Sequence, residues 1–108
     1  GTTVVKFMLH ISKDEQRARQ QERIDDPEKR WKFSAADLAE RAHWDAYQNA
    51  YEDALSKCST KHAPWHIVPA DRKWYRDWAV LQILLGTLRE LDPAYPDEEE
   101  GLDRIVVE

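Results

Sequence analysis

The chain has 108 residues, a formal net charge of −5 at pH 7 and 34% charged residues. This length fits one ordinary domain and excludes two independent cores. No stretch approaches the roughly 18 uninterrupted apolar residues of a membrane span, and we expect no signal peptide at the amino end. Because the single cysteine, Cys58, cannot form an internal disulfide, we expect a cytoplasmic protein with no membrane attachment.

The first predicted element is a strand that leads directly into a helix. Residues 4–11 are nearly continuously apolar, which is typical of a strand buried on both faces of a parallel sheet. Ser12, with Glu15 three residues later, matches a capping box and predicts that a helix begins at once. A strand followed by a helix indicates an α/β fold.

The helix predicted over residues 13–24 is polar on nearly all sides, since only Ala18 and Ile24 are apolar. Such a helix must bridge solvent, rely on charge pairs or face a charged ligand. Residues 13–32 carry seven basic side chains, so this part of an acidic chain can bind a polyanion. We expect Pro27 to begin a new short helix.

A long amphipathic helix is predicted next. Ser34 and Asp37 match a second capping box, and the helix should extend to about residue 57. Its apolar side chains recur mainly at steps of three and four, which predicts a stripe that packs against the rest of the chain. The stripe consists of Leu38, Ala42, Trp44, Tyr47, Tyr51, Ala54, Leu55 and Cys58.

A second strand over residues 65–69 and a last helix over residues 71–91 complete the predicted elements. We expect Asp71 to cap this helix. Its expected inner face carries Trp74, Trp78, Leu81, Leu85 and Leu88, and Ile83 and Leu84 broaden it. Residues 92–108 form an acidic tail, which we interpret as a weakly held strap or a partner-binding strand.

The predicted architecture is α/β and mostly helical, in the order strand, charged helix, long helix, strand, helix. Two parallel strands do not make a stable sheet alone, so the chain looks like the edge of something larger. Unprotected sheet edges and exposed tryptophans also favour self-association, and we expect a homo-oligomer.

Three runs of residues resemble the carboxy-terminal part of the polyphosphate kinase 2 family. They are residues 6–16, 23–34 and 63–75, joined by Asp37, Leu38, Trp44, Tyr47 and Tyr51. The resemblance covers residues 2 to about 91. Its runs Lys-Arg-Trp-Lys-Phe-Ser and Ala-Asp-Arg-Lys-Trp-Tyr are most similar to the branch that phosphorylates nucleoside mono- and diphosphates.

The resemblance implies a fragment of a P-loop kinase fold over residues 1–91, with residues 12–33 as its lid. It also implies phosphoryl transfer between inorganic polyphosphate and a nucleotide such as AMP or ADP, with Mg²⁺ as cofactor. The three glycines, at positions 1, 86 and 101, cannot supply a Gly-x-x-x-x-Gly-Lys loop. We therefore expect the phosphate-binding loop and the catalytic residues ahead of Gly1, and no activity from the 108-residue chain alone.

The candidate ligand contacts are basic residues of the lid, because a cationic lid neutralises charge and excludes water during phosphoryl transfer. The expected contacts with polyphosphate or nucleotide are Arg19, Arg23, Lys29, Arg30 and Lys32. The alternative is a solvated face paired with neighbouring carboxylates. Asp71, Arg72 and Lys73 follow the carboxyl end of the second strand, where open α/β sheets bind ligands. For Asp71, helix capping is the alternative.

The remaining side chains indicate structure more than chemistry. The spacing of the four histidines fits no closed metal site, so we expect no metal ligands in the chain. We expect Cys58 to be a small buried residue and the five tryptophans to belong mainly to the core. The alternative function is a non-enzymatic helical protein-interaction module. The negative net charge argues against nucleic-acid binding.

Overall fold

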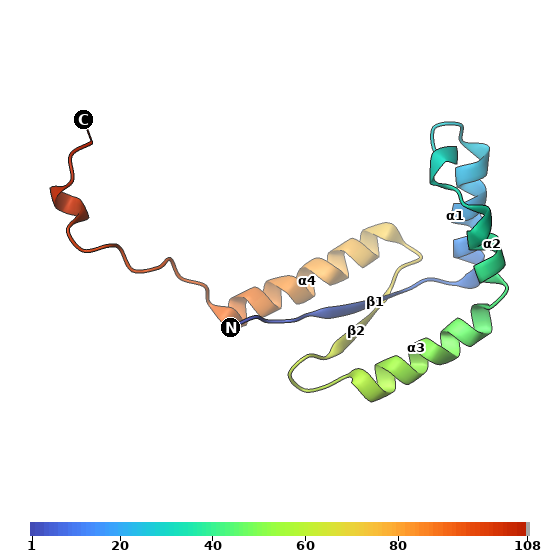
Figure 1. The fold of residues 1–108 in the computed structure, drawn as a ribbon. Helices are drawn as coiled ribbons and strands as arrows, with labels where there is room; N and C mark the ends of the chain where they lie inside the picture. The colour runs from blue at the N-terminus through green and yellow to red at the C-terminus, as the bar shows by residue number, and fades with distance from the viewer. Residues whose placement is uncertain (108) are drawn as a thin grey trace.

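The computed structural model describes residues 1–107. Its sheet consists of two parallel strands, β1 (Lys6–His10) and β2 (Trp65–Pro69), with Met8 opposite Ile67 at the centre. In Figure 1, α3 (Trp44–Cys58) and α4 (Lys73–Leu91) flank these strands. Both predicted strands and their parallel pairing are confirmed, and the architecture is α/β and mostly helical as expected.

Residues 12–33, which we call the lid segment, project beyond the end of β1 (Figure 1). The predicted polar helix is present as α1 (Lys13–Asp25). The short helix expected at Pro27 is instead a turn followed by one 3₁₀ turn, η1 (Arg30–Lys32). The carboxylate of Asp26 accepts a hydrogen bond from the Glu28 N–H at 3.0 Å, and this local turn delays the helix.

The long helix predicted from Ser34 to about residue 57 is two helices. α2 (Ala35–Arg41) ends before α3 begins. The N–H of His43 donates to the carbonyl of Glu40 at 3.0 Å, three residues back, and His43 has a ψ of 19° that leaves the helical region. The backbone thus tightens into a 3₁₀ turn and changes direction without a glycine or proline.

The apolar face that α4 turns toward the sheet is not the predicted one. Trp74 is 66% exposed and Leu81 is 62% exposed, and the rest of the predicted inner face is exposed as well apart from Ile83, which is half-buried. The half-buried positions are Tyr75, Arg76, Ala79, Val80, Ile83, Gly86 and Thr87. Because α4 carries apolar side chains on two sides, periodicity alone cannot tell which side contacts β2.

Burial in the described residues is lower than expected at several other positions. β1 was expected to be buried on both faces, but Leu9 is exposed. Much of the stripe on α2 and α3 is exposed, Cys58 included, and Trp31 is 78% exposed. Each strand has one neighbour in this part of the chain, so few apolar side chains are covered. The fully buried hydrophobic residues are Val68 and Ala70.

Residues 92–107 extend away from the sheet (Figure 1). Asp92 ends α4 with a φ of 42°, in the left-handed region, and its N–H donates to the carbonyl of Leu88. The tail then contains one 3₁₀ turn, η2 (Leu102–Arg104), and no strand among its described residues. No described helix combines the length and the apolar character needed to cross a bilayer.

Candidate functional site

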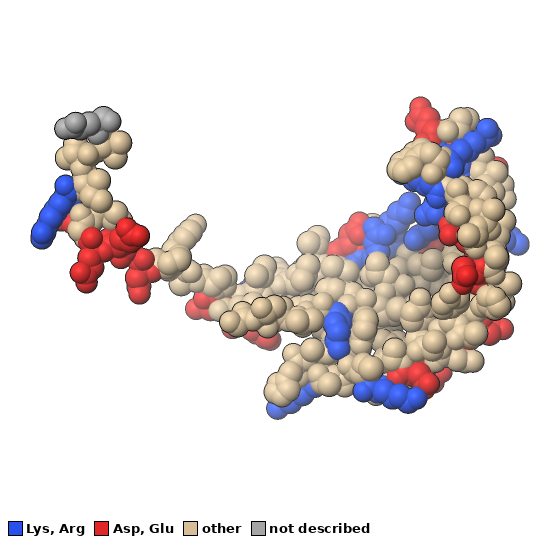
Figure 2. All heavy atoms as spheres, in the orientation of Figure 1, with Lys and Arg blue, Asp and Glu red and all other residues tan. Residues whose placement is uncertain are grey.

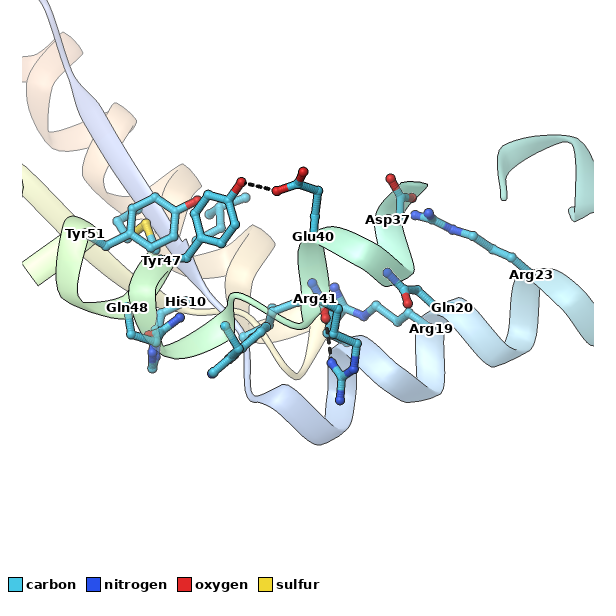
Figure 3. Close-up of a pocket in the computed structure, with 15 residues that line it drawn as sticks. His10, Arg19, Gln20, Arg23, Asp37, Glu40, Arg41, Tyr47, Gln48 and Tyr51 are labelled. Carbon is cyan, nitrogen blue, oxygen red and sulfur yellow. Dashed lines mark hydrogen bonds between the residues drawn. The ribbon is translucent and has the colours of Figure 1, made fainter. Parts of the chain in front are cut away.

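A cleft of about 600 Å³ lies where the lid segment, α2 and α3 meet the end of β1 (Figure 3). Its basic lining residues are Arg19, Arg23 and Arg41, from α1 and α2. Carboxylates and aromatic rings from α2 and α3 complete the wall opposite α1. A guanidinium group with free donors in such a cavity can bind an anion with several oxygens, since it presents a planar set of donors.

Arg23 is the arginine of this cleft whose donors the structure leaves unused. Its side chain points across the cleft toward Asp37 in Figure 3, but within residues 1–107 it makes no hydrogen bond and no ion pair. A guanidinium that lines a cleft with all its N–H groups unengaged can bind phosphate in two-pronged fashion. Arg23 is therefore the strongest of the five predicted lid contacts.

Arg19 also lines the cleft, but its guanidinium is already bound within the chain. Its Nε donates to Glu15 Oε1 at 2.8 Å, and its Nη2 donates to the carbonyls of Ala70 at 2.7 Å and Asp71 at 3.1 Å. This side chain thus connects α1 to the residues that follow β2.

The other three predicted contacts lie away from the cleft, near the tip of the lid segment. Lys29 Nζ lies 2.6 Å from Glu22 Oε1 and 3.1 Å from Asp26 Oδ2. Arg30 Nε donates to the carbonyl of Ile24 at 2.8 Å, and Lys32 Nζ lies 5.1 Å from the ring centroid of Trp31. Their local partners match the solvated, paired face, and phosphate contact by these three residues stays a prediction.

The ion pairs of Lys29 shift the pKa values of the charged groups at the tip of the lid segment, residues 22–32. Hydrogen bonds and charge attraction from Lys29 hold the pKa of Glu22 and the pKa of Asp26 below their ordinary values of 4.5 and 3.8. In return, these two carboxylates raise the pKa of Lys29 above its ordinary value of 10.5. All three groups therefore stay ionised across the whole physiological range.

We expect the tip to stay ordered at every pH at which Glu22, Asp26 and Lys29 are all ionised. At lower and at higher pH we expect the tip to lose order. The carboxylates contribute stability that is fully present above pH 4.5 and is lost as the pH falls through their lowered values. Lys29 contributes stability that is present below pH 10.5 and is lost as the pH rises through its raised value. An NMR titration of residues 22–32 measures this. In a Lys29→Gln variant the pKa of both carboxyl groups should rise, that of Asp26 less completely because it still accepts the Glu28 N–H, and unchanged titration would contradict the ion pairs.

A second cleft, of about 410 Å³, lies at the carboxyl ends of β1 and β2. Asp71 and Arg72 line it together with His10 and Trp74, whereas Lys73 does not. Their contact with a ligand stays a prediction.

The expected capping of α4 by Asp71 is wrong. Arg72 occupies the N-cap of α4 without a side-chain hydrogen bond. The Asp71 carboxylate instead accepts the N–H of Ser12 at 2.7 Å, and this bond lowers the pKa of Asp71 below its ordinary value.

Arg41 is a cleft residue that the sequence analysis missed. Its Nη1 donates to Gln16 Oε1 at 2.6 Å, and its guanidinium lies 5.8 Å from the ring centroid of Trp44. A signal existed, because five lining residues of α2 and α3 recur at steps of four, three, four and three. They are Asp37, Arg41, Trp44, Gln48 and Tyr51. Trp44 and Tyr51 were assigned to the apolar stripe, and the polar residues beside them were not predicted as part of the site.

Charge is distributed unevenly over the molecule. Figure 2 shows the acidic side chains of the tail far from the basic side chains of the lid segment.

Among residues 1–107, no group of three or more histidine, cysteine, aspartate or glutamate side chains is placed to hold a metal ion.

Comparison with known proteins shows the family to which the chain belongs. A family model described as polyphosphate kinase 2 (PPK2) matches residues 1–96. An AMP/ADP-polyphosphate phosphotransferase of Meiothermus ruber is 56% identical over all of this chain, which spans 40% of that relative. An ADP-polyphosphate phosphotransferase of Rhodopseudomonas palustris is 54% identical over 90% of this chain and 34% of its own length.

A crystal structure of polyphosphate kinase 2 from Arthrobacter aurescens TC1 has the same fold. It superposes with a TM-score of 0.89 at 53% sequence identity, over 96% of this chain and 37% of that one. The chain therefore spans about two fifths of these proteins or less. The match over residues 1–96 and the shared fold show that this chain belongs to the polyphosphate kinase 2 family.

Proposed function

We propose that this chain supplies the lid and the sheet edge of an enzyme that transfers phosphoryl groups between inorganic polyphosphate and AMP, ADP or a related nucleotide. The names of relatives from Meiothermus ruber and Rhodopseudomonas palustris support these substrates. The observation that carries the proposal is the cleft in which Arg23 presents unengaged donors beside two further arginines. In this proposal residues 1–91 belong to the kinase domain, with the lid at 12–33, and residues 92–108 are a tail outside it.

The cleft fits the chemistry of phosphoryl transfer. The transferred group carries charge on its equatorial oxygens in a loose transition state, so catalysis depends on positioning and charge stabilisation. A lid that brings guanidinium groups over the phosphates supplies both and excludes water when it closes. The phosphate-binding loop and the catalytic residues would come from a segment ahead of Gly1, because this chain has no such loop.

Mg²⁺ is the metal that we propose for the whole enzyme, since it binds phosphate oxygens together with one or two carboxylates. The described residues of this chain do not form a carboxylate cluster that fits it. Its protein ligands would therefore lie outside the residues described here.

The proposal is tested with two proteins, the 108-residue chain and a version extended at its amino end to the length of its relatives. We expect the extended protein to form ATP or ADP from polyphosphate, nucleotide and Mg²⁺, and the short chain to form none. The short chain should still retain polyphosphate in a salt-sensitive way, because its lid cations remain. An extended protein that neither transfers phosphate nor retains polyphosphate would favour the protein-interaction module.

Self-association and a cytoplasmic location stay predictions. The exposed apolar side of α4, which includes Trp74 and Trp78, supports the first, since such surfaces commonly bind another protein surface. Light scattering of the extended protein tests it. The single cysteine supports the second.

A further inference from the structure

Four residues at the base of the lid form a closed ring of hydrogen bonds, which we call the lid clamp: Ser12, Glu15, Arg19 and Asp71. Ser12 Oγ accepts the N–H of Glu15 at 3.1 Å, and Glu15 Oε1 accepts Arg19 Nε at 2.8 Å. Arg19 Nη2 donates to the carbonyl of Asp71 at 3.1 Å, and the Asp71 carboxylate accepts the N–H of Ser12 at 2.7 Å. The ring joins the start of α1 to the turn between β2 and α4.

This ring differs from an ordinary capping box. In a capping box the glutamate at the third helical position accepts the N–H of the N-cap residue. Here Asp71, 59 residues away, accepts that N–H from Ser12. Glu15 is therefore available to Arg19, and a local helix cap becomes a link between distant parts of the chain.

The clamp holds α1 to the most buried part of the molecule. Ala70, whose carbonyl accepts Arg19 Nη2 at 2.7 Å, is 1% exposed, and its N–H donates to the carbonyl of His10 at 2.8 Å. The side chain of Arg19 is 21% exposed and that of Glu15 is 31% exposed. Partly buried, charge-assisted hydrogen bonds are stronger than those in water, so the base of the lid is fixed to both strands.

The clamp lies one helical turn before Arg23 on α1. Arg19 and Arg23 are four residues apart on α1, so they share one helix face and both line the cleft. The clamp fixes the first turns of α1 at Ser12 and at Arg19. A change in the tilt or rotation of α1 would move the guanidinium of Arg23, which lies one turn further from the sheet.

We propose that Arg19 and Asp71 are positioning residues for phosphoryl transfer, which hold α1 in the orientation that brings Arg23 to the phosphates. The inference rests on the proposed function of the cleft. Arg19 acts through its three acceptors and not through a phosphate, and Asp71 acts through the N–H of Ser12.

Amide hydrogen exchange of the extended, substrate-free kinase tests the clamp without any activity measurement. In Arg19→Gln we expect the amides of residues 13–25 to exchange about tenfold faster, because the three charge-assisted hydrogen bonds of Arg19 are lost. Asp71→Ala should act similarly, whereas Asp71→Asn keeps an acceptor for Ser12 and should be closer to the unmodified protein. The matched control is Arg17→Gln, which changes the same charge on the exposed side of α1 and should leave exchange unchanged.

Kinetics of the same variants distinguish positioning from phosphate contact. Positioning predicts that Arg19→Gln and Asp71→Ala lower kcat about tenfold or more with little change in KM for polyphosphate, as for an interaction expressed in the transition state. It also predicts that Arg19→Lys does not restore activity, since an ammonium group cannot reproduce the planar fork.

Two outcomes would overturn the inference. Unchanged exchange in Arg19→Gln with a raised KM for polyphosphate would make Arg19 a direct phosphate contact. Full activity in both Arg19→Gln and Asp71→Ala would remove any positioning role. If the extended protein transfers no phosphate at all, the proposed function fails, while the exchange experiment still measures whether the clamp exists.

Discussion

Replacing Arg23 with alanine is expected to lower kcat of the extended kinase about 100- to 1,000-fold, the usual cost of removing one preorganised donor from a developing negative charge. Arg23 lines the cleft and makes no hydrogen bond or ion pair within residues 1–107. Its removal therefore takes away a potential phosphate contact without breaking an internal one. Initial rates of ATP formation from ADP at saturating polyphosphate measure the effect.

Two further variants distinguish the placement of Arg23 from the net charge of α1. Arg17→Ala removes the same charge from the exposed side of the same helix, so it should keep nearly full activity. Arg23→Lys keeps the charge but loses the two-pronged donor geometry, so its rate should lie between those of the parent and the alanine variant. Equal losses in Arg17→Ala and Arg23→Ala would mean that the net charge of α1 matters, and not the placement of Arg23.

The contrast between Arg23 and Lys29 shows what the sequence could predict about the site. Both are cations in one basic segment, which charge patterning predicted as a polyanion-binding surface, and of the two only Arg23 lines the cleft. Charge patterning could not rank the two, because the difference arises from partners in space. Lys29 lies between two carboxylates, whereas Arg23 faces the cleft.

The fold shows the same division between local and distant interactions. Ser12 and Ser34 were predicted as N-caps from their neighbours in sequence, and both accept backbone N–H groups as expected. Asp71 was predicted to cap α4, the helix that begins next to it in sequence. Its carboxylate instead accepts the N–H of Ser12, which is 59 residues away in sequence. Short-range rules predicted these two serine caps, but the hydrogen bonds that join α1 to the turn after β2 connect residues about half the chain apart.

Helix faces were predictable only where a single side is apolar. α4 has two apolar sides, and the side that carries Trp74 was assigned to the interior although it is exposed. On α2 and α3 the predicted apolar stripe overlaps the mixed face that lines the cleft, since Trp44 and Tyr51 belong to both. The stripe obscured Arg41, whose hydrogen bond to Gln16 crosses from α2 to α1.

Replacing Arg41 with alanine is expected to lower kcat/KM of the extended kinase about 10- to 100-fold, which corresponds to a charged hydrogen bond. Its Nη1 binds Gln16 Oε1 at 2.6 Å, while its other N–H groups make no hydrogen bond within residues 1–107. Arg41 thus both joins α2 to α1 and presents charge to the cleft. Arg89→Ala, which removes an exposed arginine from the last turn of α4, is the control and should retain full activity.

A double-mutant cycle separates the two contributions of Arg41. If Arg41 acts through its bond to Gln16, then Gln16→Ala alone should reduce kcat/KM, and the double variant should be little worse than Arg41→Ala. The resulting coupling should be about 0.5–3 kcal/mol, the range found for residues in direct contact. If Arg41 acts instead as a cation for the ligand, Gln16→Ala should be nearly silent and the effects should add. If neither Gln16→Ala nor Arg41→Ala changes kcat/KM, Arg41 is excluded from the site. Anion binding in the cleft would then depend on α1 alone.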